Sequence, residues 1–129
     1  MIDAHTTIRA FLLTHAPLAA LVGTRLYAGR DVPPVGYQPL AGPCITFKVR
    51  GGGPDYEDAL LNPSVQFKCY DDTEAESYDL YRTLYEAAHN GYSATVLHAA
   101  TETLGQVLSE PDTGWYFTLA YFKFMLRQA

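Results

Sequence analysis

The residues of this sequence that are able to do chemistry are two cysteines, four histidines and several acidic residues. Cys44 and Cys69 each stand alone in an apolar stretch, so we expect buried thiols that pack as small hydrophobic side chains. A disulfide between them would require neighbouring strands, and the expected cytoplasmic origin argues against one. The histidines do not fall at metal-ligand spacing with the cysteines, so we expect no zinc site. They are His5, His15, His89 and His98.

Acidic residues gather at two places, Asp71-Asp72 and residues 55–58. Paired carboxylates serve in acid–base catalysis or in cation binding. Both groups lie beside a turn or an expected helix start, where acids are favoured without any ligand. We therefore expect structural roles for them. A hydrolase that uses His98 with Asp71 and Asp72 stays open as an alternative.

Short catalytic motifs are missing from the chain. It has no GxxxxGK[ST], GxSxG or HExxH pattern and no EF-hand loop. The run Gly51-Gly52-Gly53 resembles a phosphate cradle only in its glycine content, because no helix start and no lysine follow it closely. We expect no enzyme activity and no cofactor.

The N-terminal third predicts helix followed by a long loop. Asp3 is suited to cap a first helix, and Gly23 to stop a short further turn after Pro17. Residues 25–27 look extended. Residues 28–43 hold four of the eight prolines and three glycines, and a loop of this length in a small domain is usually functional or mobile.

The middle of the chain predicts two strands and a helix. Residues 44–49 alternate, as in a half-buried strand, and the glycine run is expected to break that strand. A second strand is expected over residues 59–70, with Phe67 on its buried face. Thr73 and Glu76 then match a capping box that opens a helix ending near His89. Its expected buried stripe is Leu80, Leu84, Ala87 and Ala88, with Tyr78, Tyr81 and Tyr85 on the flank.

The last third predicts two short strands, residues 94–98 and 103–108, and a strong final strand over residues 115–126. The final strand is apolar on both faces and therefore needs cover on both, or a partner chain. Strands, one helix and more strands indicate an α+β fold over residues 1–129 as a single domain. We expect a mostly antiparallel β-sheet with two main helices packed on one face.

Composition excludes several classes of protein. With 129 residues, 48% apolar and 18% charged, the chain has the composition of a globular domain rather than of a disordered one. A net charge of −5 disfavours nonspecific nucleic-acid binding, and neither an apolar run of membrane length nor a signal peptide is present. Residues 1–54 carry a net +3 and residues 55–129 a net −8, which favours head-to-tail contacts between copies.

The order of elements resembles one known family. The sequence LVGTRLY at residues 21–27 is followed by the proline-rich loop and the strand that opens with Pro43-Cys-Ile-Thr-Phe47. Residues 65–76, VQFKCYDDTEAE, then lead into a helix, and a long aromatic strand ends the chain. This succession resembles the tail-completion, or tail terminator, family of long-tailed bacteriophages and gene transfer agent particles.

The resemblance implies a structural virion protein without cofactors, located at the head-proximal neck of the tail and assembled in the host cytoplasm. Its implied partners are copies of itself in a homohexameric ring, the tail tube protein, whose polymerisation the ring stops, and the head connector. DNA would only pass through the lumen, and no membrane is involved. The implied tube-docking loop consists of Arg50, Gly51, Gly52, Gly53, Pro54, Asp55, Tyr56, Glu57 and Asp58. The implied inter-subunit or connector loop contains Arg30, Asp31, Val32, Pro33, Pro34 and Tyr37.

A second class of function stays open from the residues alone. A small regulatory or ligand-binding α+β domain would place Tyr78, Tyr81, Tyr85 and Trp115 around one pocket. Such a domain is expected to be a monomer or a dimer, whereas a tail terminator reaches six copies.

Overall fold

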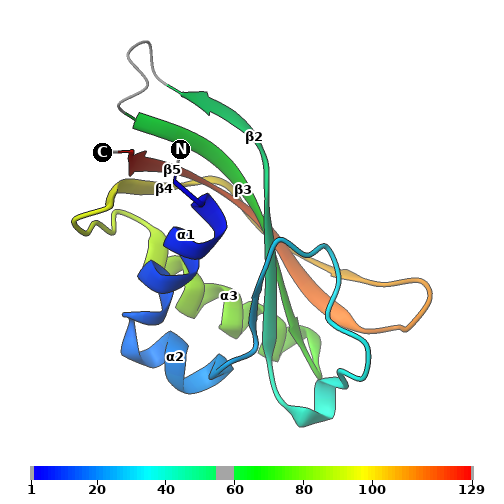
Figure 1. Cartoon of the computed structure of the whole chain (residues 1–129). Helices are drawn as coiled ribbons and strands as arrows, with labels where there is room; N and C mark the ends of the chain where they lie inside the picture. Colours follow the sequence, from blue (N-terminus) through cyan, green and yellow to red (C-terminus); the bar gives the residue numbers. More distant parts are fainter. Residues whose placement is uncertain (1, 55–59, 129) are drawn as a thin grey trace.

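The computed structural model describes residues 2–54 and 60–128 as three helices, a short 3₁₀ turn and five strands (Figure 1). The helices are α1 (Ala4–Leu13), α2 (Ala16–Val22) and α3 (Glu74–Ala88), and the 3₁₀ turn is η1 (Pro39–Ala41). The strands are β1 (Leu26–Ala28), β2 (Cys44–Pro54), β3 (Leu60–Asp71), β4 (Val96–Ser109) and β5 (Tyr116–Arg127).

The five strands form one sheet in the order β1-β2-β3-β5-β4. Only the short β1 runs parallel to its neighbour, and the other three pairings are antiparallel. All three helices lie on one side of this strongly bent sheet (Figure 1). The predicted α+β class and the helices on one face are confirmed, with α2 as a third, shorter helix.

The predicted starts and stops of the N-terminal helices are confirmed. The Asp3 carboxylate caps α1 by accepting a hydrogen bond from the Thr6 amide at 3.3 Å. Pro17 stands in the first turn of α2, where its missing N–H costs nothing, and Gly23 ends that helix with a positive φ. The two helices bury a common set of side chains against the sheet: Ile8, Phe11, Leu12, Leu18 and Val22.

The N-cap half of the capping box predicted at Thr73 is formed, and α3 begins there. The amide of Glu76 donates to the Thr73 hydroxyl at 3.1 Å, and that hydroxyl in turn donates to the Glu76 carboxylate at 3.0 Å. The helix ends at Ala88, and Asn90 takes a left-handed φ of 60°. The predicted stripe is buried, as are Ser77 and Tyr81.

The prediction that the glycine run breaks the strand is wrong. β2 continues through it, and Gly51, Gly52 and Gly53 pair with Ser64, Pro63 and Asn62 of β3 after a bulge at Arg50. A Cβ atom at Gly52 would come within 2.1 Å of the Asn62 carbonyl oxygen. The glycine therefore allows two backbones to approach closely within a bulged ladder.

The last two strands differ from the prediction in two respects. In place of two short strands, residues 96–109 form the single edge strand β4, whose pairing with β5 shifts register near Thr101, Thr103 and Gln106. These irregularities interrupt the alternation of apolar side chains, which is why the sequence pattern looks like two pieces. β5 lies between β3 and β4, and its core face is buried from Thr118 to Leu126. Its other face is buried only at Phe117 and is exposed at Lys123, Met125 and Arg127, so the expected cover on both faces is formed only in part.

The main core fills the space between the helices and the sheet. Phe67 of β3 lies at its centre, stacked on Phe47 at 5.3 Å between ring centroids and edge-on to Phe122 at 5.5 Å. A second, smaller apolar cluster lies on the opposite face of the sheet and is formed by Tyr37, Cys44, Tyr70 and Phe117.

Candidate interaction surface

The face of the sheet opposite the helices carries the features that the sequence pointed to. The segment between β1 and β2, which we call the 29–43 loop, crosses this face and closes the second apolar cluster through Tyr37. The ring of Tyr37 packs edge-on against Trp115 at 5.5 Å. The loop is thus built onto the sheet by a buried aromatic side chain.

Hydrogen bonds to backbone carbonyls order both ends of the 29–43 loop. The amides of Gly29 and Arg30 donate to the carbonyl of Phe47 at 2.7 and 3.2 Å. Near the other end, the Tyr37 hydroxyl donates to the carbonyl of Gly42 at 2.6 Å. Burial of Tyr37 raises the pKa of its hydroxyl, so the group stays a donor at physiological pH.

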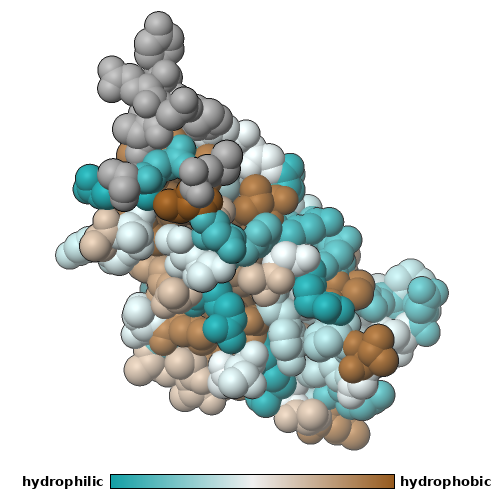
Figure 2. Space-filling view, in the orientation of Figure 1, coloured by the Kyte–Doolittle hydropathy of each residue, from teal (hydrophilic) through white to brown (hydrophobic). Residues whose placement is uncertain are grey.

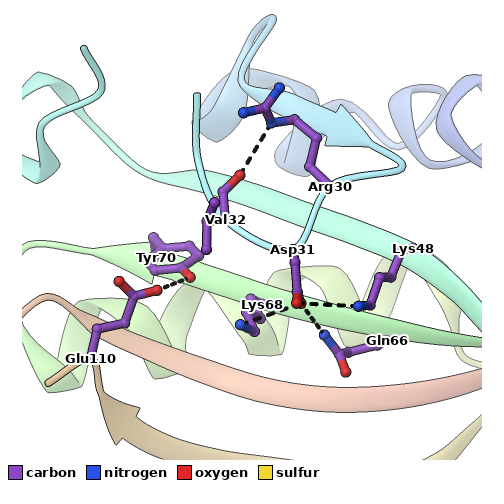
Figure 3. Close-up of polar contacts among 8 residues, drawn as sticks. All are labelled: Arg30, Asp31, Val32, Lys48, Gln66, Lys68, Tyr70 and Glu110. Atoms are coloured by element: carbon purple, nitrogen blue, oxygen red, sulfur yellow. Dashed lines mark hydrogen bonds and ion pairs between the residues drawn. The ribbon is translucent and has the colours of Figure 1, made fainter. Parts of the chain in front are cut away.

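Asp31 ties the middle of the loop to two strands. Its carboxylate lies 3.2 Å from the Lys48 ammonium nitrogen and 3.5 Å from that of Lys68, and it accepts a hydrogen bond from the Gln66 amide at 2.9 Å (Figure 3). The hydrogen bond from Lys48 is the main reason that the pKa of Asp31 is lowered. Figure 3 also shows Tyr70 donating to Glu110 on the same face.

The anchored loop presents apolar side chains to solvent. Val32 is 49% exposed, Leu40 is 86% exposed and Val35 is fully exposed, whereas Pro33 and Tyr37 are buried. Figure 2 shows apolar surface over the part of the molecule that Figure 1 draws in cyan. Exposed apolar residues on a fixed segment are typical of a surface that contacts another protein.

The structure thus divides the residues predicted for an inter-subunit or connector loop. Asp31, Pro33 and Tyr37 hold the loop on the sheet, and Arg30 and Val32 are exposed. Pro34 is half-buried between them. Sequence reasoning missed Val35 and Leu40, because a loop has no periodicity from which the exposed side can be read.

Arg50 lies on the same face of the sheet in a second polar cluster. Its Nε donates to the Ser64 hydroxyl at 3.0 Å, its guanidinium is 3.6 Å from the Glu102 carboxylate, and it covers the ring of Tyr121 at 3.9 Å. The Ser64 hydroxyl donates to Glu102 at 2.6 Å. These contacts link β2, β3 and β4, so Arg50 and the three glycines belong to the sheet and not to a loop tip.

Of the other residues predicted for tube docking, the structure describes only Pro54. The backbone of Pro54 is the last position of β2 and pairs with Leu61. Asp55, Tyr56, Glu57 and Asp58 lie outside the described residues.

The pocket expected for a ligand-binding domain is only partly formed. Tyr78, Tyr81 and Tyr85 do line one groove, of about 290 Å³, together with Arg82, Glu86 and Leu104. Trp115 is not among the lining residues, because it packs against Tyr37 and Tyr70 on the opposite face of the sheet. The expectation of four aromatic residues around one pocket is therefore wrong.

The arrangement of His98 with Asp71 and Asp72 that the hydrolase alternative requires is not formed. His98 pairs with Met125 near one end of β5, whereas Asp71 pairs with Tyr116 at the other end. Nine residues of strand, about 30 Å, separate these two positions. Asp71 instead accepts a hydrogen bond from the Asp72 amide at 2.8 Å, and burial raises the pKa of its carboxyl.

The cysteines are buried free thiols, as predicted. Cys44 belongs to the smaller apolar cluster and Cys69 to the main core, so their side chains lie on opposite faces of the sheet although their strands are neighbours. Burial raises the pKa of Cys44 to about 12 and also raises that of Cys69. Neither thiol is therefore suited to act as a nucleophile.

Over residues 2–54 and 60–128, no group of three or more His, Cys, Asp or Glu side chains is placed to hold a metal ion. Within the same described ranges, no helix has the length and apolar character needed to cross a bilayer.

Comparisons with known proteins identify solved structures that have a similar fold. No protein-family model and no curated protein matches the sequence. Among solved structures, a chain of the virion of a native gene transfer agent particle superposes with a TM-score of 0.65 at 18% identity, covering 98% of this chain and 99% of that one. The gp17 protein of bacteriophage SPP1 superposes with a TM-score of 0.52 at 18% identity, covering 95% and 88%. This chain therefore shares its fold, over nearly its whole length, with proteins of a gene transfer agent virion and of a bacteriophage.

Proposed function

We propose that this chain is a tail-completion, or tail terminator, protein. In this proposal it forms a homohexameric ring at the head-proximal end of the tail tube, stops polymerisation of the tube and joins it to the head connector. DNA passes through the lumen of the ring, and the protein has no catalytic role. The protein is assembled in the host cytoplasm and becomes part of the virion neck.

One observation carries the proposal. The superposition on the gene transfer agent virion chain covers 98% of this chain and 99% of the other, with a TM-score of 0.65. A shared fold does not by itself fix a function, so the exposed apolar side chains of the 29–43 loop provide the second support.

The surface described above suits such a role. The 29–43 loop holds exposed apolar side chains in a fixed position, which lowers the entropy cost of binding another protein. In the proposal it contacts a neighbouring subunit or the head connector. In the same proposal, residues 50–58 contact the tail tube.

Tail-tube growth tests the proposal. Purified chain is added to the tail tube protein of the same particle while the tubes polymerise, and tube lengths are measured in electron micrographs. We expect shorter tubes with a ring of density at one end. Tubes of unchanged length with bare ends would contradict the proposal.

A matched pair of variants shows whether the 29–43 loop takes part. Val35→Asp places a charge on its exposed apolar surface, and Tyr92→Asp places one on a side chain of 80% exposure at another site. We expect V35D to lose ring formation or connector joining and Y92D to behave as the wild type. Equal ring formation and connector joining by the two variants would show that the 29–43 loop does not form the contact.

A further inference from the structure

A shallow groove between α3 and the edge strand β4 is the starting point. Tyr78 and Tyr81 lie 5.5 Å apart between ring centroids, and Tyr81 and Tyr85 lie 6.3 Å apart. Tyr81 is buried, but Tyr78 is 41% exposed, and Leu104 of β4 beside it is 67% exposed. The groove, which we call the tyrosine groove, thus offers apolar and aromatic surface to solvent.

The backbone of β4 is shaped around this groove. A Cβ atom at Gly105 would come within 2.7 Å of the Tyr81 ring and of the Thr118 methyl group. The glycine lets the strand lie directly on the buried tyrosine. Its neighbour Leu104 lines the groove with an exposed side chain.

The tyrosine groove holds one acidic side chain without an ion-pair partner among the described residues. The charged residues among those that line it are Arg82 and Glu86. Arg82 pairs with Asp79 at 3.5 Å. Glu86, which lines the groove, has no ion pair within the described part of the chain.

The 29–43 loop has the complementary properties. It presents Val32, Val35 and Leu40, and its one acid, Asp31, is already neutralised by Lys48 and Lys68. Its remaining charge is the exposed Arg30, whose Nε donates to the Val32 carbonyl at 3.2 Å. The guanidinium is therefore held at the backbone of Val32 (Figure 3).

The loop and the groove cannot meet within one molecule. The loop packs on the face of the sheet opposite the helices, and the groove lies on the helix side at the β4 edge. A contact between them therefore joins two copies through different surfaces. Such a heterologous contact repeats from copy to copy, and it gives a ring when the rotation closes.

We propose that the 29–43 loop of one copy docks into the tyrosine groove of a second copy. Val32 and Val35 pack against Tyr78 and Leu104, and Arg30 lies near Glu86. The inference rests on the proposed ring, and it names the two surfaces that form the ring contact. Its test uses the chain alone, so that the result does not depend on the tail tube.

Disulfide trapping between two singly substituted proteins tests the contact. Val35→Cys protein is mixed with Leu104→Cys protein under mild oxidation, and crosslinked dimers are measured on non-reducing gels. Cys44 and Cys69 are buried and do not interfere. We expect a heterodimer yield at least about tenfold above that of the control mixture of V35C with Tyr92→Cys, whose side chain is similarly exposed. Equal yields in the two mixtures would overturn the proposal.

Charge reversal provides a second, independent test. Arg30→Glu and Glu86→Arg are each expected to lower the fraction of multimer in sedimentation velocity or the trapped yield, and the double variant is expected to restore it. If the double variant does not recover the multimer fraction or the trapped yield that each single variant loses, Arg30 and Glu86 do not pair. A chain that traps V35C to L104C but fails to shorten tail tubes would refute the proposed function and leave the contact standing.

Discussion

The carboxylate of Asp31 lies 3.2 Å from the ammonium group of Lys48, which connects the 29–43 loop to an interior strand of the sheet. Lys68 on the next strand approaches the same carboxylate at 3.5 Å. A segment rich in proline and glycine is thereby fixed as a surface. Its exposed valines and leucine are offered to a partner in one defined arrangement.

Removal of the Asp31 charge should loosen the loop without unfolding the protein. In Asp31→Asn the two ion pairs are lost. Because the Asp31 side chain is 53% exposed and solvent screens both pairs, we expect a loss of at most about 1 kcal/mol in the free energy of unfolding. Amide hydrogen exchange within the loop should accelerate severalfold. Asp112→Asn, in an exposed turn, serves as the control, and equal exchange in both variants would show that Asp31 is not an anchor.

The same ion pairs predict a dependence on pH. Lys48 and Lys68 lower the pKa of Asp31, so the folded protein favours the ionised carboxylate. Its stabilising contribution is present above the unfolded pKa of about 4 and is lost as the pH falls through the lower folded pKa. We expect the melting temperatures of wild type and D31N to differ at pH 7 and to converge near pH 2. A difference that persists at pH 2 would contradict this assignment.

Two adjacent glycines should respond differently to substitution. A Cβ atom at Gly52 meets the Asn62 carbonyl at 2.1 Å and the residue has a φ of 102°, whereas a Cβ atom at Gly53 meets nothing within 4 Å. We expect Gly52→Ala to cost about 1–3 kcal/mol in the free energy of unfolding and Gly53→Ala to stay within about 0.5 kcal/mol. Urea unfolding of the two variants measures this difference, and similar values for both would refute the close approach of β2 and β3.

Truncation of the central aromatic side chain should be severe. Phe67 is fully buried between Phe47 and Phe122, so Phe67→Ala leaves a cavity and is expected to cost about 3–5 kcal/mol. Tyr92→Ala, which truncates an aromatic ring that is 80% exposed, is expected to change the free energy of unfolding by less than about 0.5 kcal/mol. Chemical denaturation distinguishes the two, and a loss below about 1 kcal/mol for F67A would place the core elsewhere.

The sequence by itself determined the parts of this protein that depend on neighbouring residues. The caps at Asp3 and Thr73 are hydrogen bonds across three residues, and the buried stripe of α3 follows from the period of the helix. The buried faces of β2 and β3 follow from alternation, which places Phe47 and Phe67 in the core. The α+β class follows from the order of these elements.

Only the tertiary structure decided the features that depend on distant residues. The glycine run lies in a strand because Asn62 and Pro63 pair with it, and β4 is one strand because β5 supports it across its irregularities. Trp115 and the three tyrosines of α3 are separated by the sheet, which no local pattern shows. The exposure of Val35 and Leu40 likewise depends on Asp31 and Tyr37 fixing the 29–43 loop on strands far along the chain. Hydrogen bonds and periodicity between neighbouring residues determine the helices and strands, whereas contacts between distant residues determine which side chains reach the surface.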